Sequence, residues 1–327
     1  MAAIRIHGKK WQARISRKGH KSIIKSFITK QDAERWARQV EVELDKGIYL
    51  NQNLAERTTF KELIERYMRE VTPTMRGAKS DLIRLTAIAR RPIAKLNVLS
   101  VTPQAISKYR DERLKEVSNG TVIRELAYLS SIFTVARREW GFNITNPVSM
   151  VKKPSSPQGR NRILNESELN KLLNALQPTG RKSIWMVPLV KLALETGMRR
   201  GELLGLHWNE INFNTRTAFI PLTKNGESRT VPLSTEAIRI LQSIPRSIDG
   251  IVFPITHEVV SQAFNRARKR AGVEDIHFHD LRHMAITRMA EKLPNLIELS
   301  AVSGHKSLAM LKRYYHPNPE LLAEKLG

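Results

Sequence analysis

The sequence has no cysteine, which excludes disulfide bonds, thiolate catalysis and cysteine-ligated zinc. It also has no apolar run of the ~18 residues that a membrane-spanning helix requires. Even the stretch from Ile184 to Val190 is interrupted by Pro188 and followed by Lys191. The first residues, Met1 to Arg5, lack the apolar stretch of a secretion signal. We therefore expect a cytoplasmic protein with no membrane partner.

Acidic residues are scarce relative to basic ones. The chain of 327 residues has 31 Asp and Glu against 55 Lys and Arg, and its formal net charge is +24. This excess of positive charge favours a polyanionic partner such as nucleic acid; a basic but otherwise ordinary enzyme is the alternative. The length favours two or three domains, each able to bury its own core.

Residues 1–56 are expected to form a small basic domain, because every Asp, Glu, Lys or Arg before Asp32 is a Lys or Arg. Three segments rich in β-favouring residues, with turn signals between them, predict an antiparallel sheet: Ala3 to His7, Trp11 to Ile15 and Ile23 to Phe27. Thr29 and Asp32 then resemble a capping box that begins a helix. The helix would cover one sheet face and leave Arg and Lys on the other, which suits the DNA major groove. A solvated charged hairpin is the alternative.

Residues 57–153 show the apolar spacing of helices. Thr59 and Glu62 predict a capping box, and Thr102-Pro103 predicts another helix start. Asn119-Gly120 precedes a long helical pattern that ends at Gly141. We expect a compact helical bundle whose apolar stripes form a core rather than a ligand site.

Residues 152–162 contain two prolines and no apolar side chain, and they predict an extended linker. Asn165 and Glu168 then predict the cap of a new helix. Residues 163–327 therefore form the last expected domain, which contains the residues suited to chemistry.

Two basic residues in this domain are candidates for binding an anion. Arg199 follows a Thr-Gly-Met turn, and Glu202 lies three residues later, where its carboxylate can brace the guanidinium. Lys224 lies beside Asn225-Gly226 between two predicted strands, 217–220 and 229–232, so it is expected near a hairpin tip. Taken singly, each would more often be an ordinary surface residue.

Three histidines lie within 277–283. His279 and Arg282 are three residues apart, on one face of a helix. His277, His279 and His283 could instead bind zinc, but no strongly spaced motif such as His-Glu-x-x-His supports a metal site. His277 and His283 are interpreted as core or capping residues.

Near the C-terminus, Gly304-His305 is followed nine residues later by Tyr314, within Lys312-Arg313-Tyr314-Tyr315-His316. A phenol within reach of imidazole and guanidinium groups can cleave a phosphodiester covalently, without metal or ATP. Tyr315 is a second candidate phenol.

These residues, in this chain order, resemble the catalytic set of the tyrosine recombinases of the phage integrase family: Arg199, Lys224, His279, Arg282, His305 and Tyr314. The Arg-Tyr-x-His pattern of that family selects Tyr314 over Tyr315. The resemblance implies a fold that is mainly α with small β elements (α+β). Its domains would be an arm-type DNA-binding domain with a three-stranded sheet plus helix (1–56), a helical core-binding bundle (57–153) and a mixed α/β catalytic domain (163–327).

The chemistry expected of this set begins with Arg199 and Arg282, whose paired donors hold the phosphate oxygens. Tyr314 is the nucleophile; because a tyrosine has an ordinary pKa of about 10, it needs a proton acceptor, and His279 is the candidate base. The resemblance implies that Lys224 protonates the departing 5′ oxygen and that His305 donates a hydrogen bond. No cofactor or metal is expected.

The resemblance implies a site-specific recombinase that integrates or excises a mobile element. Its expected partners are double-stranded DNA attachment sites, three further copies in a homo-tetramer, and accessory DNA-bending or excision factors. An amphipathic helix over 320–326 would dock on a neighbouring protomer or fold back on its own domain. The alternatives are DNA relaxation of the type IB topoisomerase kind and a non-catalytic DNA-binding regulator.

Overall fold

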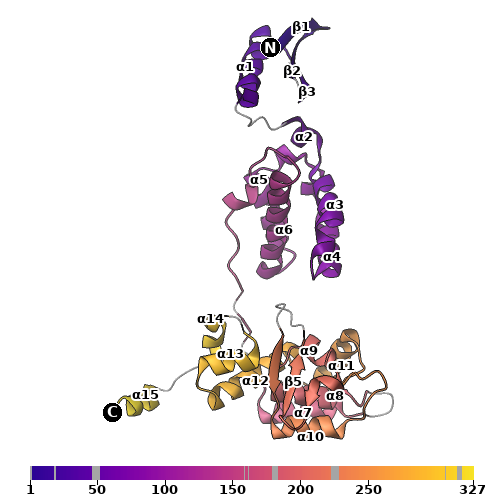
Figure 1. The fold of residues 1–327 in the computed structure, drawn as a ribbon, viewed down its shortest axis with the longest axis vertical. Helices are drawn as coiled ribbons and strands as arrows, with labels where there is room; N and C mark the ends of the chain where they lie inside the picture. The colour runs from indigo at the N-terminus through magenta and orange to yellow at the C-terminus, as the bar shows by residue number, and fades with distance from the viewer. Residues whose placement is uncertain are drawn as a thin grey trace. The chain divides into compact units, whose positions relative to one another are not determined.

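A computed structural model describes residues 2–17, 20–45, 52–157, 159–160, 162–178, 183–221, 228–305, 307–314 and 319–327. The chain forms two compact units, Met1–Gln158 and Gly159–Gly327 (Figure 1). The boundary between these units falls inside the 152–162 segment for which the sequence predicts a linker. The finer division into domains 1–56, 57–153 and 163–327 stays a prediction. None of the helices in the described ranges is long and apolar enough to cross a membrane.

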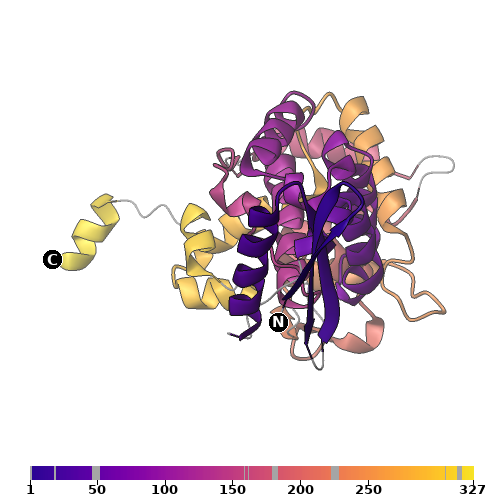
Figure 2. The same cartoon turned by 90° about the horizontal axis from the view of Figure 1, so that it is seen from above.

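The first unit begins with an antiparallel sheet of strands β1 (Ala2–His7), β2 (Lys10–Arg17) and β3 (His20–Phe27), in that order. Side chains along a strand alternate between the two faces, so Ala13, Ile15 and Ile23 are buried on one of them. Helix α1 (Lys30–Asp45) packs on that face and contributes Ala33, Ala37 and Val40 to the same core (Figures 1 and 2). The predicted sheet-plus-helix arrangement is confirmed.

The other face of this sheet carries basic side chains. Arg5 pairs with Gln12 across β1 and β2, and its guanidinium donates to Gln12 Oε1 at 3.0 Å. In the next row, Arg14 lies between Ala3 and Ile24, and Ile24 is 45% exposed. This face therefore offers cationic and apolar groups together.

The rest of the first unit is helical. Its helices are α2 (Gln52–Arg57), α3 (Phe60–Glu70), α4 (Ala78–Ala89), α5 (Pro103–Leu114) and α6 (Asn119–Arg138). Short 3-10 turns connect them: η1 (Thr72–Thr74), η2 (Pro92–Lys95), η3 (Val98–Ser100) and η4 (Pro147–Met150). The predicted capping box of Thr59 and Glu62 is present, and Thr102 caps α5. The core is separate from that of the sheet, and Phe60 and Phe133 stack within it at 5.1 Å between ring centroids.

A buried ion pair joins α5 to α6 in this core. Arg113 Nη2 donates to Glu125 Oε1 at 2.7 Å, and Arg113 Nε donates to Oε2 at 2.9 Å. The Tyr109 hydroxyl also donates to Glu125 Oε2, at 2.7 Å. Arg113 and Glu125 are 8% and 7% exposed. Because both charges are desolvated, each depends on the other for its stability.

We predict that Glu125→Ala destabilises the helical part of the first unit by about 3–5 kcal/mol, because a buried guanidinium loses its main partner. Hydrogen exchange of the α6 amides in the intact chain measures this free energy of opening. The control is Glu65→Ala, which breaks an exposed i,i+4 pair with Lys61 and should cost less than about 1 kcal/mol. Equal losses of opening free energy in the two variants would show that the buried pair stabilises the bundle no more than an exposed pair does.

The second unit combines helices with a small sheet. Its helices are α7 (Glu166–Leu176), α8 (Met186–Thr196), α9 (Arg200–Leu204), α10 (Thr235–Ser243), α11 (His257–Arg270), α12 (Phe278–Lys292), α13 (Leu296–Ser303), α14 (Leu308–Leu311) and α15 (Pro319–Leu326), with 3-10 turns η5 (Trp208–Glu210) and η6 (Lys312–Tyr314). The antiparallel strands are β4 (Ile211–Asn212), β5 (Thr217–Ile220) and β6 (Arg229–Pro232), in that order. The sequence predicts β5 and β6 but not the two-residue β4. The mainly α fold with small sheets is confirmed.

Helix α8 lies at the centre of this unit. Leu189, Val190, Leu192 and Ala193 are all buried, and α8 packs against α7, α9, α10, α11 and α12. An apolar helix can be stable only when neighbours cover it on most sides. As a result, the turn that follows α8 is held directly against α12.

A smaller apolar cluster packs α13, α14 and η6 against α12. Ile286 and Ala290 of α12 pack there with Leu299, Leu311 and Tyr314. The turn η6 is thereby fixed to α12, and Tyr314 is only 8% exposed.

Candidate active site

A glycine turn after α8 sets the position of Arg199. Gly197 ends α8 in the left-handed conformation, with φ 61°, which glycine adopts at the least cost. A Cβ at this position would lie 3.5 Å from Ile286 and 3.6 Å from Ala285, so the turn packs closely on α12. The chain then reverses direction, and Arg199 becomes the N-cap residue of α9.

Glu202 holds Arg199 in place, as the three-residue spacing predicts. The backbone N–H of Arg199 donates to Glu202 Oε2 at 2.8 Å, and Arg199 Nη1 donates to Oε1 at 2.8 Å. Arg199 Nη2 donates to the main-chain carbonyl of Gly304 at 3.1 Å. The guanidinium is therefore fixed between α9 and the end of α13.

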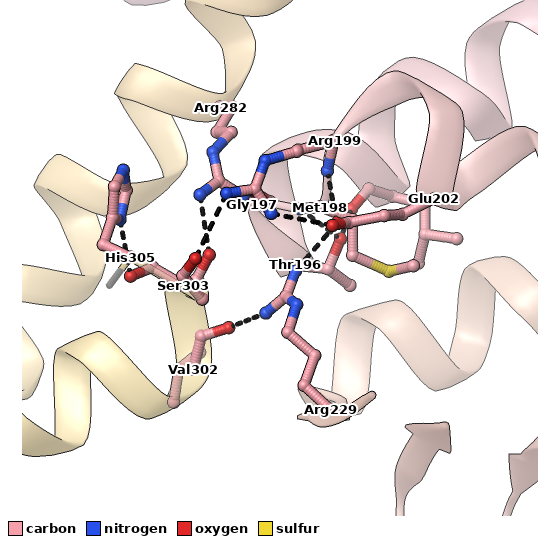
Figure 3. A network of polar contacts seen from close by, with 12 residues as sticks. Thr196, Gly197, Met198, Arg199, Glu202, Arg229, Arg282, Val302, Ser303 and His305 are labelled. Atoms are coloured by element: carbon pink, nitrogen blue, oxygen red, sulfur yellow. Dashed lines mark hydrogen bonds and ion pairs between the residues drawn. The ribbon is translucent and has the colours of Figure 1, made fainter. Parts of the chain in front are cut away.

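Arg282 is the more deeply buried arginine, at 3% exposure. Its Nη1 donates to the carbonyl of Gly197 at 2.5 Å and its Nη2 to the carbonyl of Ser303 at 2.6 Å (Figure 3). Burial, with the nearby charge of Arg199, lowers the pKa of Arg282 to about 10. Arg282 therefore remains charged at neutral pH, although its hydrogen-bond acceptors are main-chain carbonyls rather than water.

Arg229, the first residue of β6, is a member of this network that the sequence does not predict. Its Nη2 donates to Glu202 Oε2 at 2.8 Å and its Nη1 to the carbonyl of Val302 (Figure 3). Within the described part of the chain, Arg229 Nε is buried without a hydrogen-bond acceptor. No local signal marks this residue, because its role comes from contacts with residues far along the chain.

Glu202 is shared by Arg199 and Arg229. Burial alone would raise the pKa of this carboxyl group. The charge of Arg229 and the hydrogen bonds from both arginines outweigh burial, so the pKa of Glu202 is below its ordinary value. One carboxylate thus orients two guanidinium groups, and the positive charges outnumber the negative one.

His305 follows directly after α13. Gly304 ends that helix with φ 67°, and His305 Nδ1 then lies 2.8 Å from Ser303 Oγ. Burial and the charges of Arg282 and Arg199 lower the pKa of His305 to about 4. His305 is therefore a neutral imidazole at pH 7, with one N–H that it can donate.

Tyr314 contacts His283 and lies close to His305 of the same chain. Its hydroxyl forms a hydrogen bond with His283 Nδ1, and the two rings stack with their centroids 5.7 Å apart. The Tyr314 ring also lies 6.1 Å from the His305 ring, and the His279 and His283 rings are 5.2 Å apart. Burial lowers the pKa of His279 below its ordinary value, and its electrostatic interaction with His283 and Arg282 adds to this effect.

The structure therefore brings five of the six predicted residues together: Arg199, His279, Arg282, His305 and Tyr314. Lys224 lies outside the described residues, as does Tyr315. His283, which the sequence suggests is a core or capping residue, instead contacts the candidate nucleophile. Its position four residues after His279 is the one signal in the sequence that could have indicated this.

The zinc alternative finds no geometric support in the described ranges, where no group of three or more His, Cys, Asp and Glu is placed to hold a metal ion. His277 instead caps α12 together with Asp280, whose carboxylate accepts from the His277 backbone N–H at 2.8 Å.

A cavity of about 420 Å³ opens beside the arginines. Arg199 and His279 line it, together with Arg200 and Phe278. Arg200 Nη1 donates to Ser261 Oγ at 2.6 Å, which ties this wall to α11. The cavity gives an anionic ligand access to the Arg199 side of the network.

Comparison with known proteins identifies the family. The phage integrase family model matches residues 162–320, and the model of the phage integrase N-terminal domain matches residues 56–154. A putative integrase/recombinase of Haemophilus influenzae is 38% identical over 332 residues, which cover 97% of this chain and 88% of that protein. The chain belongs to the phage integrase family, and the resemblance inferred from its motifs is confirmed.

Two further comparisons agree with this assignment. The shufflon-specific DNA recombinase of Escherichia coli is 41% identical over 272 residues, which cover 80% of this chain and 70% of the relative. The structure of a lambda integrase tetramer bound to a Holliday junction superimposes with a TM-score of 0.64, at 22% identity, over 93% of this chain and 95% of that one. That likeness shows a shared fold.

We predict that Gly304→Ala destabilises the second unit more than Gly272→Ala does. Both glycines have positive φ, 67° and 63°, so both substitutions should cost about 1–2 kcal/mol of backbone strain. A Cβ at Gly304 would also lie 2.9 Å from Arg229 Cδ and Nε, whereas one at Gly272 would meet nothing within 4 Å. This overpacking should add about 1–3 kcal/mol. Calorimetry of the two variants tests the difference, and equal losses would mean that Arg229 moves aside freely.

We predict that an NMR titration of labelled histidines places the midpoint of His305 near pH 4. Because this folded-state pKa lies below the ordinary histidine value, the stability associated with neutral His305 falls as the pH drops from about 6.5 towards 4. Arg282→Gln should raise the midpoint, since it removes a neighbouring positive charge. Arg239→Gln, which removes an exposed charge on α10, should leave it unchanged. An identical midpoint in both variants would contradict this electrostatic explanation.

Proposed function

We propose that the protein is a site-specific DNA recombinase that cleaves and rejoins strands through a 3′-phosphotyrosine intermediate, and so integrates or excises a mobile element. The observation that carries this proposal is the hydrogen bond of the Tyr314 hydroxyl to His283, which directly follows Arg282 on α12. The guanidinium groups of Arg282 and Arg199 are both fixed by main-chain carbonyls at the end of α13. Membership of the phage integrase family supports it. So do the relatives, which are named integrase/recombinase and shufflon-specific DNA recombinase.

The first step is the binding of the scissile phosphate. Phosphoryl transfer concentrates negative charge on the non-bridging oxygens. Arg199 and Arg282 are held by carbonyls and by Glu202 before any substrate arrives, so little reorganisation is needed when that charge develops. By analogy with arginine fingers, removal of either should slow cleavage by about 10³–10⁵-fold.

The second step is the covalent exchange. Tyr314 Oη loses its proton and forms a bond to phosphorus, and the bond from phosphorus to the 5′ oxygen breaks. Lys224 supplies a proton to the departing 5′ oxygen, and neutral His305 donates a hydrogen bond to a phosphate oxygen. The 3′-phosphotyrosyl bond conserves the energy of the phosphodiester. The free 5′ hydroxyl of a partner strand can therefore reverse the reaction without ATP or a cofactor.

The other parts of the chain serve DNA binding and assembly in this proposal. The basic face of the N-terminal sheet, with Arg5 and Arg14, suits an arm-type DNA-binding domain over residues 1–56. The helical bundle, 57–153, would bind the core site, and the catalytic domain, 163–327, would cleave it. Four copies would assemble on paired attachment sites. A lambda integrase with the same fold is known as a tetramer bound to a Holliday junction, which supports a tetramer here. Accessory DNA-bending or excision factors and a cytoplasmic site of action complete the proposal.

DNA relaxation without strand exchange and non-catalytic DNA binding are the competing functions. The relatives are named recombinases and integrases rather than topoisomerases, and the pocket has a buried nucleophile beside its arginines. Neither competitor is favoured by any feature of the site. Incubation with a supercoiled plasmid that lacks a recombination site tests for DNA relaxation. A topoisomerase would relax this plasmid, whereas a site-specific recombinase would leave it supercoiled.

We predict that Tyr314→Phe binds its attachment site with unchanged affinity but forms no covalent adduct on a nicked suicide substrate, because only the attacking hydroxyl is lost. The target sequence is to be found by sequencing the DNA that flanks the gene and searching it for short direct repeats. Tyr315→Phe is the matched control and should still become joined to DNA. An adduct formed by Tyr314→Phe but not by Tyr315→Phe would assign the nucleophile to Tyr315, and adducts in neither protein nor in the wild type would refute the proposed function.

A further inference from the structure

The hydrogen bond between Tyr314 and His283 pairs the candidate nucleophile with a histidine outside the expected catalytic set. His283 Nδ1 contacts the Tyr314 hydroxyl, and the rings stack at an interplanar angle of 27°. His283 lies on α12 directly after Arg282, whose side chain is fixed by two carbonyls. Tyr314 is held by the apolar cluster against the same helix. Both members of the pair are therefore positioned by packing before DNA binds.

The two histidines of α12 face different parts of the site. His279 lines the cavity beside Arg199, where it can meet the phosphate. His283 faces the tyrosine hydroxyl. A general base must lie within hydrogen-bond reach of the proton that it removes, and His283 meets this condition through its Nδ1.

The electrostatic surroundings suit proton transfer between these two groups. Tyr314 interacts electrostatically with Arg282, and His283 interacts with His279 and His305. The other charged groups that act on Arg282, His279 and His305 are Asp280 of α12, Arg199 and Glu202 at α9 and Arg229 of β6. This mainly cationic environment lowers the pKa of both His279 and His305. Positive charge stabilises a phenolate while it disfavours an imidazolium. The phosphate neutralises part of that charge when it binds, which makes the imidazole a better acceptor.

We propose that His283, rather than His279, accepts the proton of Tyr314 during cleavage; this inference rests on the proposed recombinase function. The Tyr314 proton moves to His283 Nδ1 as Oη bonds to phosphorus, and the electron pair of the broken phosphorus–oxygen bond leaves with the 5′ oxygen. In rejoining, the 5′ hydroxyl gives its proton to Lys224 and attacks phosphorus, the bond from phosphorus to Tyr314 Oη breaks, and the imidazolium returns its proton to Tyr314. His279 then remains available as a hydrogen-bond donor to the phosphate.

The test compares His283→Asn and His283→Ala with the wild-type full chain on a nicked suicide substrate. Asparagine can keep a hydrogen bond to the Tyr314 hydroxyl but cannot take its proton, so it separates positioning from proton transfer. We expect both variants to bind DNA normally and to form the covalent adduct about 10²–10⁴-fold more slowly at pH 7, the usual contribution of a general base. The deficit should shrink as the pH rises towards the ordinary tyrosine pKa of about 10, because hydroxide then replaces the base.

A second substrate, with sulfur in place of the bridging 5′ oxygen, shows whether a variant has lost the general base for Tyr314 or the general acid for the leaving group. A thiolate leaves without protonation, so this substrate rescues a missing general acid but not a missing base. The His283 variants should stay slow on it. His207→Asn, a matched change at a histidine that caps η5, should react at the wild-type rate on both substrates.

Three results would overturn the inference: wild-type rates in His283→Asn, rescue of either variant by the sulfur substrate, or a deficit that is constant with pH. Each leaves the recombinase function intact, provided that the wild type forms its adduct through Tyr314. A wild type that forms no adduct would instead refute the proposed function itself.

Discussion

The burial of Arg282 between two main-chain carbonyls is the constraint on which the rest of the site depends. A guanidinium group that is 3% exposed needs hydrogen-bond acceptors in place of water. The carbonyls of Gly197 and Ser303 supply them. These carbonyls belong to the ends of α8 and α13, so the need to solvate one charge brings two distant turns against α12. Arg199 follows the first turn and His305 follows the second, and both residues therefore lie close enough to interact electrostatically with each other and with Arg282.

The pocket is maintained by a balance of charge rather than by isolated ion pairs. Glu202 binds Arg199 and Arg229 at once, which limits the repulsion among three guanidinium groups. Burial and the remaining positive charge lower the pKa of His279 and of His305, the latter to about 4. A site with net positive charge is suited to binding a phosphodiester. Its guanidinium groups are already fixed in position, so little reorganisation is needed when the anion binds.

Much of the fold and part of the site could be predicted from the sequence. Periodicity and turn signals predicted the sheet, α1 and the hairpin strands β5 and β6, and the caps of α3, α5 and α7 followed from Thr59, Thr102 and Asn165. Spacing also predicted that Glu202 would contact Arg199. Arg229 and His283 were missed for the same physical reason: each acquires its role from tertiary contacts, with the Val302 carbonyl and with Tyr314. Strand β4 was missed because two residues give no periodic pattern.

In the proposed reaction, one chain supplies both the attacking phenol and the arginines that hold the phosphate. To test this, Tyr314→Phe protein is mixed with Arg282→Ala protein on a suicide substrate that carries two binding sites, and the covalent adduct is measured on a denaturing gel. Since His283 and Tyr314 of the same chain are in contact, we expect the mixture to form no more adduct than either variant alone. Adduct at a large fraction of the wild-type amount would show instead that the tyrosine and the arginines come from different protomers.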